Sequence, residues 1–173
     1  MHCHDDGVLP IVVVAGVAGS GKTSVGLLVA SELGWPFADG DSFHTTASVA
    51  KMRSSAPLTD ADRLPWLQTI AAWIGEREAA GGGGVVACSA LKRSYRDLLR
   101  DGHPAVRFAF LNASPAALDQ RLRERPQHFM PAALLASQLA DLEPLGADEP
   151  GGSVDASGPT EQTAAAIRAT LDL

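Results

Sequence analysis

The sequence has few cysteines and no long apolar run, and these two absences exclude several classes of protein. Cys3 and Cys88 are its two cysteines, one near the start of the chain and one in an apolar stretch, so we expect no disulfide. No apolar run approaches the roughly 20 residues that span a bilayer. Residues 1–6 lack the basic and apolar regions of a signal peptide. The sequence therefore predicts a cytoplasmic protein that has no membrane partner.

Basic charge is also scarce. The net charge of -6 argues against nucleic acid as the main partner, because phosphate backbones require a basic face. A local basic pocket for a small phosphorylated ligand is compatible with that total. Asn112 is the sole asparagine and precedes Ala113, so the Asn-Lys-x-Asp motif of guanine-specific switches is missing.

What the chain does have is a regular alternation of apolar strands with amphipathic helices. Its 173 residues and 46% hydrophobic content fit one domain with a proper core, spanning residues 1–173. We interpret residues 1–9 as a loose N-terminus, in preference to a metal site built from its His-Cys-His run. The alternation predicts an α/β fold with a mostly parallel sheet covered by helices on both faces. The predicted strands are residues 11–15, 35–38, 85–88, 106–111 and 153–156.

A glycine-rich turn follows the first predicted strand and fits the pattern of a P-loop. In this motif backbone N–H groups and a helix N-terminus surround a phosphate, the lysine reaches the β- and γ-phosphates, and the threonine hydroxyl ligates magnesium. The strand before the turn and the Lys-Thr pair after it favour this interpretation over an ordinary Gly-Ser-Gly loop. The residues predicted to contact the nucleotide are Gly16, Ala18, Gly19, Ser20, Gly21, Lys22, Thr23 and Ser24.

Two carboxylates close the second predicted strand as Asp39-Gly40-Asp41. Residues two apart on an extended segment share a face, so both carboxylates can point toward the γ-phosphate. We predict that Asp39 holds magnesium together with Thr23, and that Asp41 orients the acceptor hydroxyl or removes its proton. The alternative is an acidic turn around Gly40 with no such role.

Several polar and basic residues downstream are candidates for binding the acceptor. A substrate with a carboxylate requires charged donors, and arginine offers a bidentate fork. Arg63 follows two aspartates, so a surface ion pair is the alternative for it. The turn after the third predicted strand also offers a hydroxyl and a lysine. The predicted acceptor ligands are Asp41, His44, Lys51, Arg63, Ser89, Lys92 and Arg96.

Arg121 and Arg125 lie four residues apart on one predicted helix, just before a segment rich in proline and glycine. Arginines delivered to a transferring phosphate stabilise its charge in the transition state. Arg121 is therefore a predicted nucleotide ligand, and Lys22, Asp41 and Arg125 are the predicted catalytic residues. Residues 126–150 are predicted to form a lid that excludes water. The alternative for Arg121 and Arg125 is that they lie on a solvated basic helix with no role in transfer.

Together these segments resemble gluconokinases of the P-loop, shikimate-kinase-like type, over residues 10–170. The most specific ones are Asp39-Gly40-Asp41-Ser42-Phe43-His44 and Ser89-Ala90-Leu91-Lys92. The others that match are Lys51-Met52, Pro57–Arg63, Pro65–Leu67, Arg125, His128-Phe129, Gln138-Leu139, Leu142–Pro144 and Gly146–Glu149.

The resemblance implies transfer of the γ-phosphate of ATP to the 6-hydroxyl of D-gluconate, with magnesium as cofactor. Another small acceptor, such as shikimate or a related sugar acid, is the alternative. The family likeness further implies the strand order 2-3-1-4-5, a lid and often a homodimer. It adds His128 as a substrate ligand, and Pro159, in the turn after the last strand, as a contact for adenine.

Overall fold

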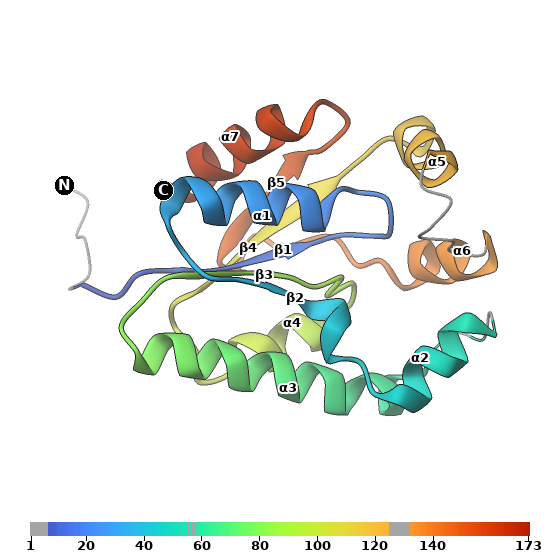
Figure 1. The fold of residues 1–173 in the computed structure, drawn as a ribbon, viewed down its shortest axis with the longest axis horizontal. Coiled ribbons are helices and arrows are strands. Elements are labelled where there is room, and N and C mark those ends of the chain that lie inside the picture. The colour runs from blue at the N-terminus through green and yellow to red at the C-terminus, as the bar shows by residue number, and fades with distance from the viewer. Residues whose placement is uncertain (1–6, 55, 57, 125–131) are drawn as a thin grey trace.

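The computed structural model describes residues 7–54, 56, 58–124 and 132–173. Its strands run in the order β2-β3-β1-β4-β5, all parallel, as the resemblance implied. In Figure 1, α1 and α7 cover one face of this sheet, while α3 and α4 cover the other. The strands are β1 (Ile11–Ala15), β2 (Phe37–Asp39), β3 (Gly84–Ala87), β4 (Val106–Asn112) and β5 (Gly151–Asp155).

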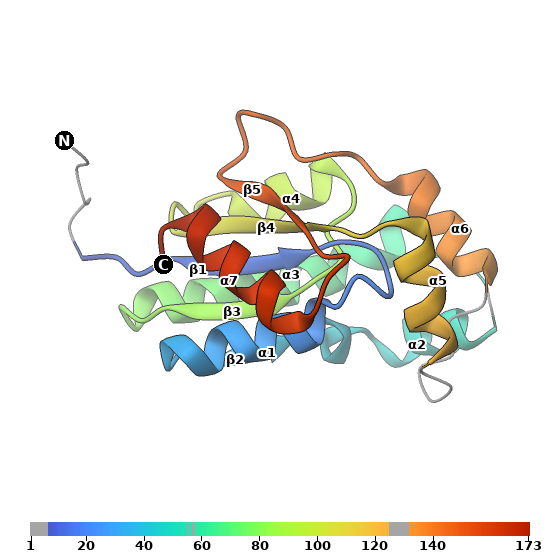
Figure 2. The same cartoon turned by 90° about the horizontal axis from the view of Figure 1, so that it is seen from above.

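Helices α1, α3, α4 and α7 pack on the two faces of the sheet. Helices α2, α5 and α6 gather near the end of the sheet at which β1 finishes, and Figure 2 shows the same grouping from above. The α-helices are α1 (Lys22–Leu33), α2 (Thr46–Arg53), α3 (Asp60–Ala79), α4 (Arg93–Arg100), α5 (Pro115–Arg123), α6 (Ala132–Asp141) and α7 (Thr160–Leu171).

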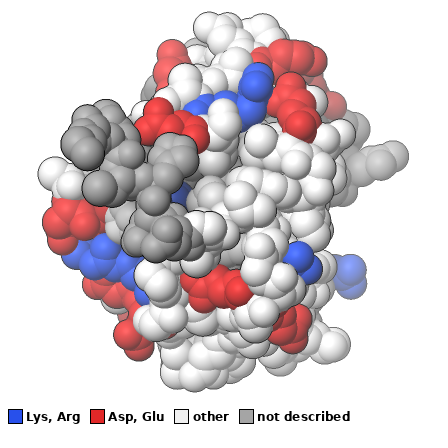
Figure 3. All heavy atoms as spheres, turned by 90° about the vertical axis from the view of Figure 1, so that its left-hand side faces the viewer, with Lys and Arg blue, Asp and Glu red and all other residues white. Residues whose placement is uncertain are grey.

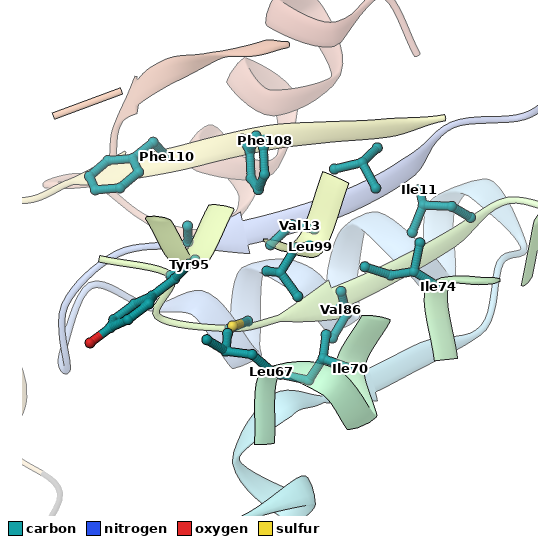
Figure 4. Close-up of a cluster of buried hydrophobic side chains, with 14 of the residues drawn as sticks. Ile11, Val13, Leu67, Ile70, Ile74, Val86, Tyr95, Leu99, Phe108 and Phe110 are labelled. Carbon is teal, nitrogen blue, oxygen red and sulfur yellow. The ribbon is translucent and has the colours of Figure 1, made fainter. Parts of the chain in front are cut away.

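The core has two halves, one on each face of the sheet, because each central strand is buried on both sides. Figure 4 shows the half beneath the sheet, where Ile70 and Ile74 of α3 meet Val13, Val86 and neighbouring side chains. On the other face, Val25 and Val29 of α1 pack with Ile167 of α7. Continuous apolar strands of this kind are typical of parallel sheets, which are buried on both faces.

The helix ends follow local sequence signals. Thr59 and Asp62 form a capping box at the start of α3. Ser114 caps α5 and is followed by Pro115 at the first helical position. Gly34 ends α1 in the left-handed conformation, with a φ of 68°.

The structure moves the start of two strands by two residues and adds one short helix. β2 begins at Phe37, two residues later than predicted, since Pro36 lacks the N–H that a strand uses for pairing. A short 3-10 helix, η1 (Gly40–Phe43), follows β2 and was not predicted. β5 begins at Gly151, two residues earlier than predicted. There a φ of 127°, together with a Cβ that would lie 2.0 Å from the Phe108 carbonyl oxygen, requires glycine.

At the end of the molecule where β1 begins, Figure 3 shows acidic and basic side chains interspersed with each other. In the described part of the chain, no helix is long and apolar enough to cross a membrane. Part of the predicted lid lies in α6 and in the loop that leads from it to β5.

Candidate active site

The carboxyl ends of β1, β2 and β3 meet at a cleft of about 430 Å³, where a parallel α/β sheet places its ligands. The P-loop, the acidic turn after β2 and the turn after β3 all contribute to its lining. Of the predicted site residues, those that line the cleft are Ala18, Gly19, Gly21, Lys22, Thr23, Asp39, Asp41, His44, Arg63, Ser89 and Arg121. A larger depression of about 740 Å³ lies at the C-terminal end of α4 and the start of β4. It contains none of the predicted site residues.

The P-loop has the backbone shape that phosphate binding requires. Gly16, Gly19 and Gly21 all have positive φ, which side chains larger than hydrogen rarely adopt. At Gly16 a Cβ would lie 2.9 Å from the Leu111 carbonyl oxygen. Helix α1 begins at Lys22 without any side-chain cap, so the N–H groups of its first turn face outward beside Thr23. This end of α1 is suited to an anion.

Lys22 lies inside the cleft, where its Nζ donates to the Val17 carbonyl oxygen at 3.0 Å. Burial lowers the pKa of Lys22, and the negative charge of Asp41 opposes this effect. Ser20 is buried, and its hydroxyl donates to the same carbonyl at 2.6 Å, so that side chain stabilises the loop from within.

The acidic turn is held tightly by its neighbours. The Asp39 carboxylate caps η1 by accepting from the Asp41 N–H at 3.0 Å, while the Asp41 side chain is 77% exposed. Gly40 packs against β3 so closely that a Cβ would lie 2.3 Å from the Ala87 carbonyl oxygen. The Trp66 indole donates to the Gly40 carbonyl at 2.7 Å. Asp41 is therefore presented to the cleft by a fixed backbone.

His44 lies beside this turn and stacks on Trp66, with ring centroids 4.3 Å apart. Its Nε2 is 4.0 Å from Asp41 Oδ1, and its buried Nδ1 has no hydrogen-bond partner among the described residues. Burial lowers the pKa of His44, the Asp41 charge opposes that shift, and Arg63 adds to it. His44 is consequently neutral near pH 7 and can exchange a hydrogen bond with a ligand hydroxyl.

Arg63 lies across the cleft from the P-loop, at the centre of a polar network. Its Nη1 donates to the Tyr95 hydroxyl at 2.8 Å and to Asp141 Oδ2 at 3.2 Å. The Tyr95 hydroxyl in turn donates to the Asp60 carboxylate, which also accepts from Lys92 at 3.0 Å. The alternative for Arg63, a surface ion pair with its neighbouring aspartates, is not what the structure shows, because its partners are distant in sequence.

Three of the predicted acceptor ligands that the structure describes lie outside the lining of the cleft, namely Lys51, Lys92 and Arg96. Lys51 is bonded to Asp62 at 2.6 Å, and Lys92 is bonded to Asp60. The Asp62 carboxylate also caps α3, and the hydrogen bond from Lys51, followed by those from Thr59, lowers its pKa to about 2. Both ammonium groups are therefore paired with carboxylates in the first turn of α3.

Arg96 requires a correction, because the structure places it in the interior. Its side chain is fully buried and donates from Nε and Nη2 to the two Glu149 oxygens, at 2.7 and 3.1 Å. It also donates to the carbonyls of Ala90, Leu91 and Pro144. A guanidinium so fully bonded and enclosed has no donor for a substrate, so Arg96 instead fastens the loop after α6 to α4.

Arg121 joins two loops of the nucleotide side. Its guanidinium donates to the carbonyls of Gly19 and Ser20 in the P-loop, and to those of Ala156 and Gly158 after β5. Pro159 is the N-cap residue of α7, directly after that turn, and lies outside the lining of the cleft. Arg125 and His128 fall outside the described residues.

Sequence reasoning assigned no role in the site to some residues that line the cleft, among them Met52, Trp66 and Gln138. Trp66 is both buried and part of the lining. Gln138 belongs to α6, and its Oε1 accepts from the Ala18 N–H at 2.8 Å. Gln138-Leu139 matches the family resemblance, but no spacing along the chain signals this contact.

The residues present fit a magnesium–nucleotide complex. Thr23 and Asp39 both line the cleft beside the P-loop, and magnesium takes one or two carboxylates together with phosphate oxygens and waters. Within the described ranges, no group of three or more His, Cys, Asp or Glu side chains could hold a metal on its own. That donor set suits an ion that arrives with phosphates.

Known proteins resemble the chain in both sequence and structure. The shikimate kinase family model matches residues 18–141. A gluconokinase of Gluconobacter oxydans (strain 621H) is 51% identical over 80% of this chain and 78% of its own length. The thermosensitive gluconokinase of Escherichia coli (strain K12) is 42% identical over 79% of this chain and 73% of its own.

Two solved structures extend the likeness to the fold. A sugar kinase from Janibacter sp. HTCC2649 has a TM-score of 0.89 at 46% identity, over 95% of both chains. A gluconokinase from Sinorhizobium meliloti 1021 has a TM-score of 0.84 at 43% identity, over 95% of this chain and 93% of that one. With such identities over most of its length, the chain belongs to the gluconokinase family of P-loop kinases.

Proposed function

We propose that the protein transfers the γ-phosphate of ATP to the 6-hydroxyl of D-gluconate, giving 6-phosphogluconate and ADP. The observation that carries this proposal is a single cleft lined by the P-loop, by Asp41 and by Arg63. Donor and acceptor sites thus open into one space, which phosphoryl transfer requires. The gluconokinase relatives support gluconate as the acceptor.

On the donor side, the residues of the P-loop bind the phosphates. Backbone N–H groups and the uncapped start of α1 receive phosphate oxygens, and the Lys22 ammonium balances the charge that develops. Thr23 and Asp39 would hold magnesium, which neutralises phosphate charge when it is bound. Arg121 keeps the P-loop and the turn after β5 together, so its contribution to ATP binding comes through both loops.

On the acceptor side, Asp41 is the residue placed to handle the hydroxyl. The acceptor oxygen bonds to the γ-phosphorus, the bond to the oxygen of the leaving ADP breaks, and the proton of the hydroxyl passes to the Asp41 carboxylate. Arg63 binds the carboxylate end of the sugar acid, while His44 and Ser89 bind its hydroxyls. Lys51 and Lys92 add positive charge at the rim.

Other expectations from the sequence belong to the same proposal. Arg125 acts on the transferring phosphate, His128 on the substrate, and Pro159 on adenine. A lid over residues 126–150 closes on the substrates, although its last part is fastened to α4 through Arg96 and Glu149. A cytoplasmic location and a homodimer complete this proposal.

The test is an acceptor panel with the full chain, ATP and magnesium, followed by ADP release. We expect turnover with gluconate far above that with shikimate or water, and a phosphorus NMR signal for an ester at the 6-oxygen. Asp41→Asn should lower turnover about 100-fold or more, which is a usual contribution of general acid–base catalysis. Asp101→Asn, on the exposed end of α4, is the matched control. Turnover with gluconate no higher than with water would reject the proposal.

A further inference from the structure

Helix α6 presents one face to the active site. Leu135, on this face, and Leu142, just beyond the helix, pack against the cluster of Val17, Leu91 and Leu118, and Val17 belongs to the P-loop. Leu139, on another side of α6, is 47% exposed. Ser137 and Gln138 line the cleft. The inward face of α6 is therefore apolar at its ends and polar between them.

The first polar contact of this face reaches the donor side. Gln138 Oε1 accepts from the Ala18 N–H at 2.8 Å, and Ala18 lines the cleft beside Lys22. Backbone N–H groups of a P-loop are the donors that hold phosphate oxygens. A phosphate oxygen carries charge and is a stronger acceptor than a neutral amide. An oxygen of ATP that takes the Ala18 N–H displaces Gln138.

The second polar contact reaches the acceptor side. Asp141 Oδ2 accepts from Arg63 Nη1 at 3.2 Å, and Asp141 Oδ1 lies 4.0 Å from Lys92 Nζ. The side chains of Arg63 and Asp141 are mostly buried, with 12% and 26% exposure. Asp141 thus presents a carboxylate to the same guanidinium that the carboxylate of a sugar acid requires. The two carboxylates compete for Arg63.

We propose that α6 couples the binding of ATP to the binding of the acceptor, through Gln138 and Asp141. The two residues are three positions apart, nearly one turn, so they move together when the helix shifts. A ligand that displaces one of them frees α6 to move with the proposed lid and weakens the other contact, and the second ligand then binds more tightly. The inference rests on the proposed function, because it needs gluconate as the competitor for Arg63.

Linkage makes this coupling reciprocal. If ATP raises the affinity for gluconate by a given factor, gluconate raises the affinity for ATP by the same factor. The contacts in question are one hydrogen bond to a neutral amide and one charged pair, so we expect a factor of about tenfold, within the usual range of such couplings. Gln138 and Asp141 act as positioning residues here, since they act through α6.

The experiment is calorimetric titration of the full chain with gluconate, in magnesium buffer, with and without a non-hydrolysable ATP analogue. We expect gluconate to bind about tenfold more tightly when the analogue is present, and the analogue to respond equally to gluconate. In Gln138→Ala and Asp141→Asn the factor should fall below about threefold. Each variant should also bind its own ligand more tightly when that ligand is alone. Thermal melting checks that both variants fold.

Matched controls come from α5. Gln120→Ala removes a glutamine whose amide donates, among the described residues, to Glu124 at the end of α5, and Asp119→Asn removes a carboxylate from a surface pair with Arg123. Both should keep the wild-type factor. If Gln138 and Asp141 served only the stability of α6, their variants would weaken both ligands and leave the ratio unchanged, which would overturn the inference.

The outcomes separate the two proposals. A wild-type protein that binds and phosphorylates gluconate with a coupling factor of one overturns the inference alone. A protein that neither binds nor phosphorylates gluconate rejects the proposed function and the inference with it. Equal factors in the wild type, Gln138→Ala and Asp141→Asn also overturn the inference.

Discussion

Arg63 and Arg96 occupy similar surroundings and differ in what they can do. Each guanidinium lies over an aromatic ring, at 5.5 Å from Tyr95 and 5.4 Å from Phe110 respectively, and each is paired with a carboxylate from residues 141–149. Arg96 is fully enclosed and bonded in fork geometry. Arg63 reaches the cleft, and its hydrogen bonds within the described residues leave from Nη1 alone.

Residue type and a carboxylate partner therefore do not distinguish a structural arginine from a ligand-binding one. The deciding quantities are enclosure and the number of donors already used. A buried charge needs full compensation, which removes it from chemistry. An arginine at a cleft wall uses fewer of its N–H donors, so the carboxylate of a ligand can replace the carboxylate that pairs with it.

The largest expected effect comes from breaking the enclosed pair. Glu149→Ala leaves the Arg96 charge buried without its partner, and we expect a loss of about 3–5 kcal/mol in the free energy of unfolding. Urea denaturation at pH 7 measures it. Asp148→Ala is the control, since that neighbouring carboxylate is exposed and pairs with Arg93 at the surface. Equal losses in the two variants would show that enclosure is not what distinguishes Arg96.

Arg63→Ala should affect activity and leave stability nearly intact. We expect kcat/KM for gluconate to fall about 100-fold, or ~2.8 kcal/mol at 1.4 kcal/mol per tenfold. Steady-state kinetics and a thermal melt measure the two quantities. Arg123→Ala, at an exposed arginine of α5, should change neither. A large drop in melting temperature with normal kinetics would place Arg63 in the same structural class as Arg96.

The smallest effect is a titration that reports on Arg63 through space. His44 has a lowered pKa, mainly from burial and partly from the Arg63 charge, so Arg63→Ala should raise it while Arg100→Ala leaves it unchanged. NMR titration of the ring protons measures this pKa. A value in the wild type at or above 6.5 would contradict the geometry of the cleft.

The lowered pKa of His44 also makes the free energy of unfolding depend on pH. The folded protein binds the His44 proton less tightly than the unfolded chain, whose pKa is 6.5. As the pH falls below that value, the unfolded chain takes up the proton first, and the free energy of unfolding decreases. Above pH 6.5 both states are neutral at this position, and the contribution of His44 to stability is fully present.

The sequence was sufficient for features that depend on local chemistry. The P-loop, the capping box at Thr59 and the apolar central strands are each encoded in a few adjacent residues, and the structure confirms the sheet that they build. The strand order came from the family resemblance. The convergence of the P-loop, Asp41 and Ser89 on one cleft followed from the rule that loops meet at the carboxyl ends of parallel strands.

Contacts between distant segments could not be predicted. Arg96 and Glu149 are 53 positions apart, and Ala18 and Gln138 are 120 apart. No periodicity or spacing signals such pairs, so Arg96 was assigned to the substrate and Gln138 was given no contact. At Gly151 the glycine that lets β5 approach Phe108 also weakened the strand signal, since glycine has low β-propensity.

Gly40 has a consequence for anyone who wishes to change the acceptor specificity of this enzyme. Every side chain at this position would collide with the backbone of β3, and the carbonyl of Gly40 is already bonded to Trp66. A mutant library should therefore keep residues 39–41 and Trp66 constant as a module. Diversity belongs on the opposite wall, at Val49, Met52 and Arg53, where the lining is made of side chains on α2.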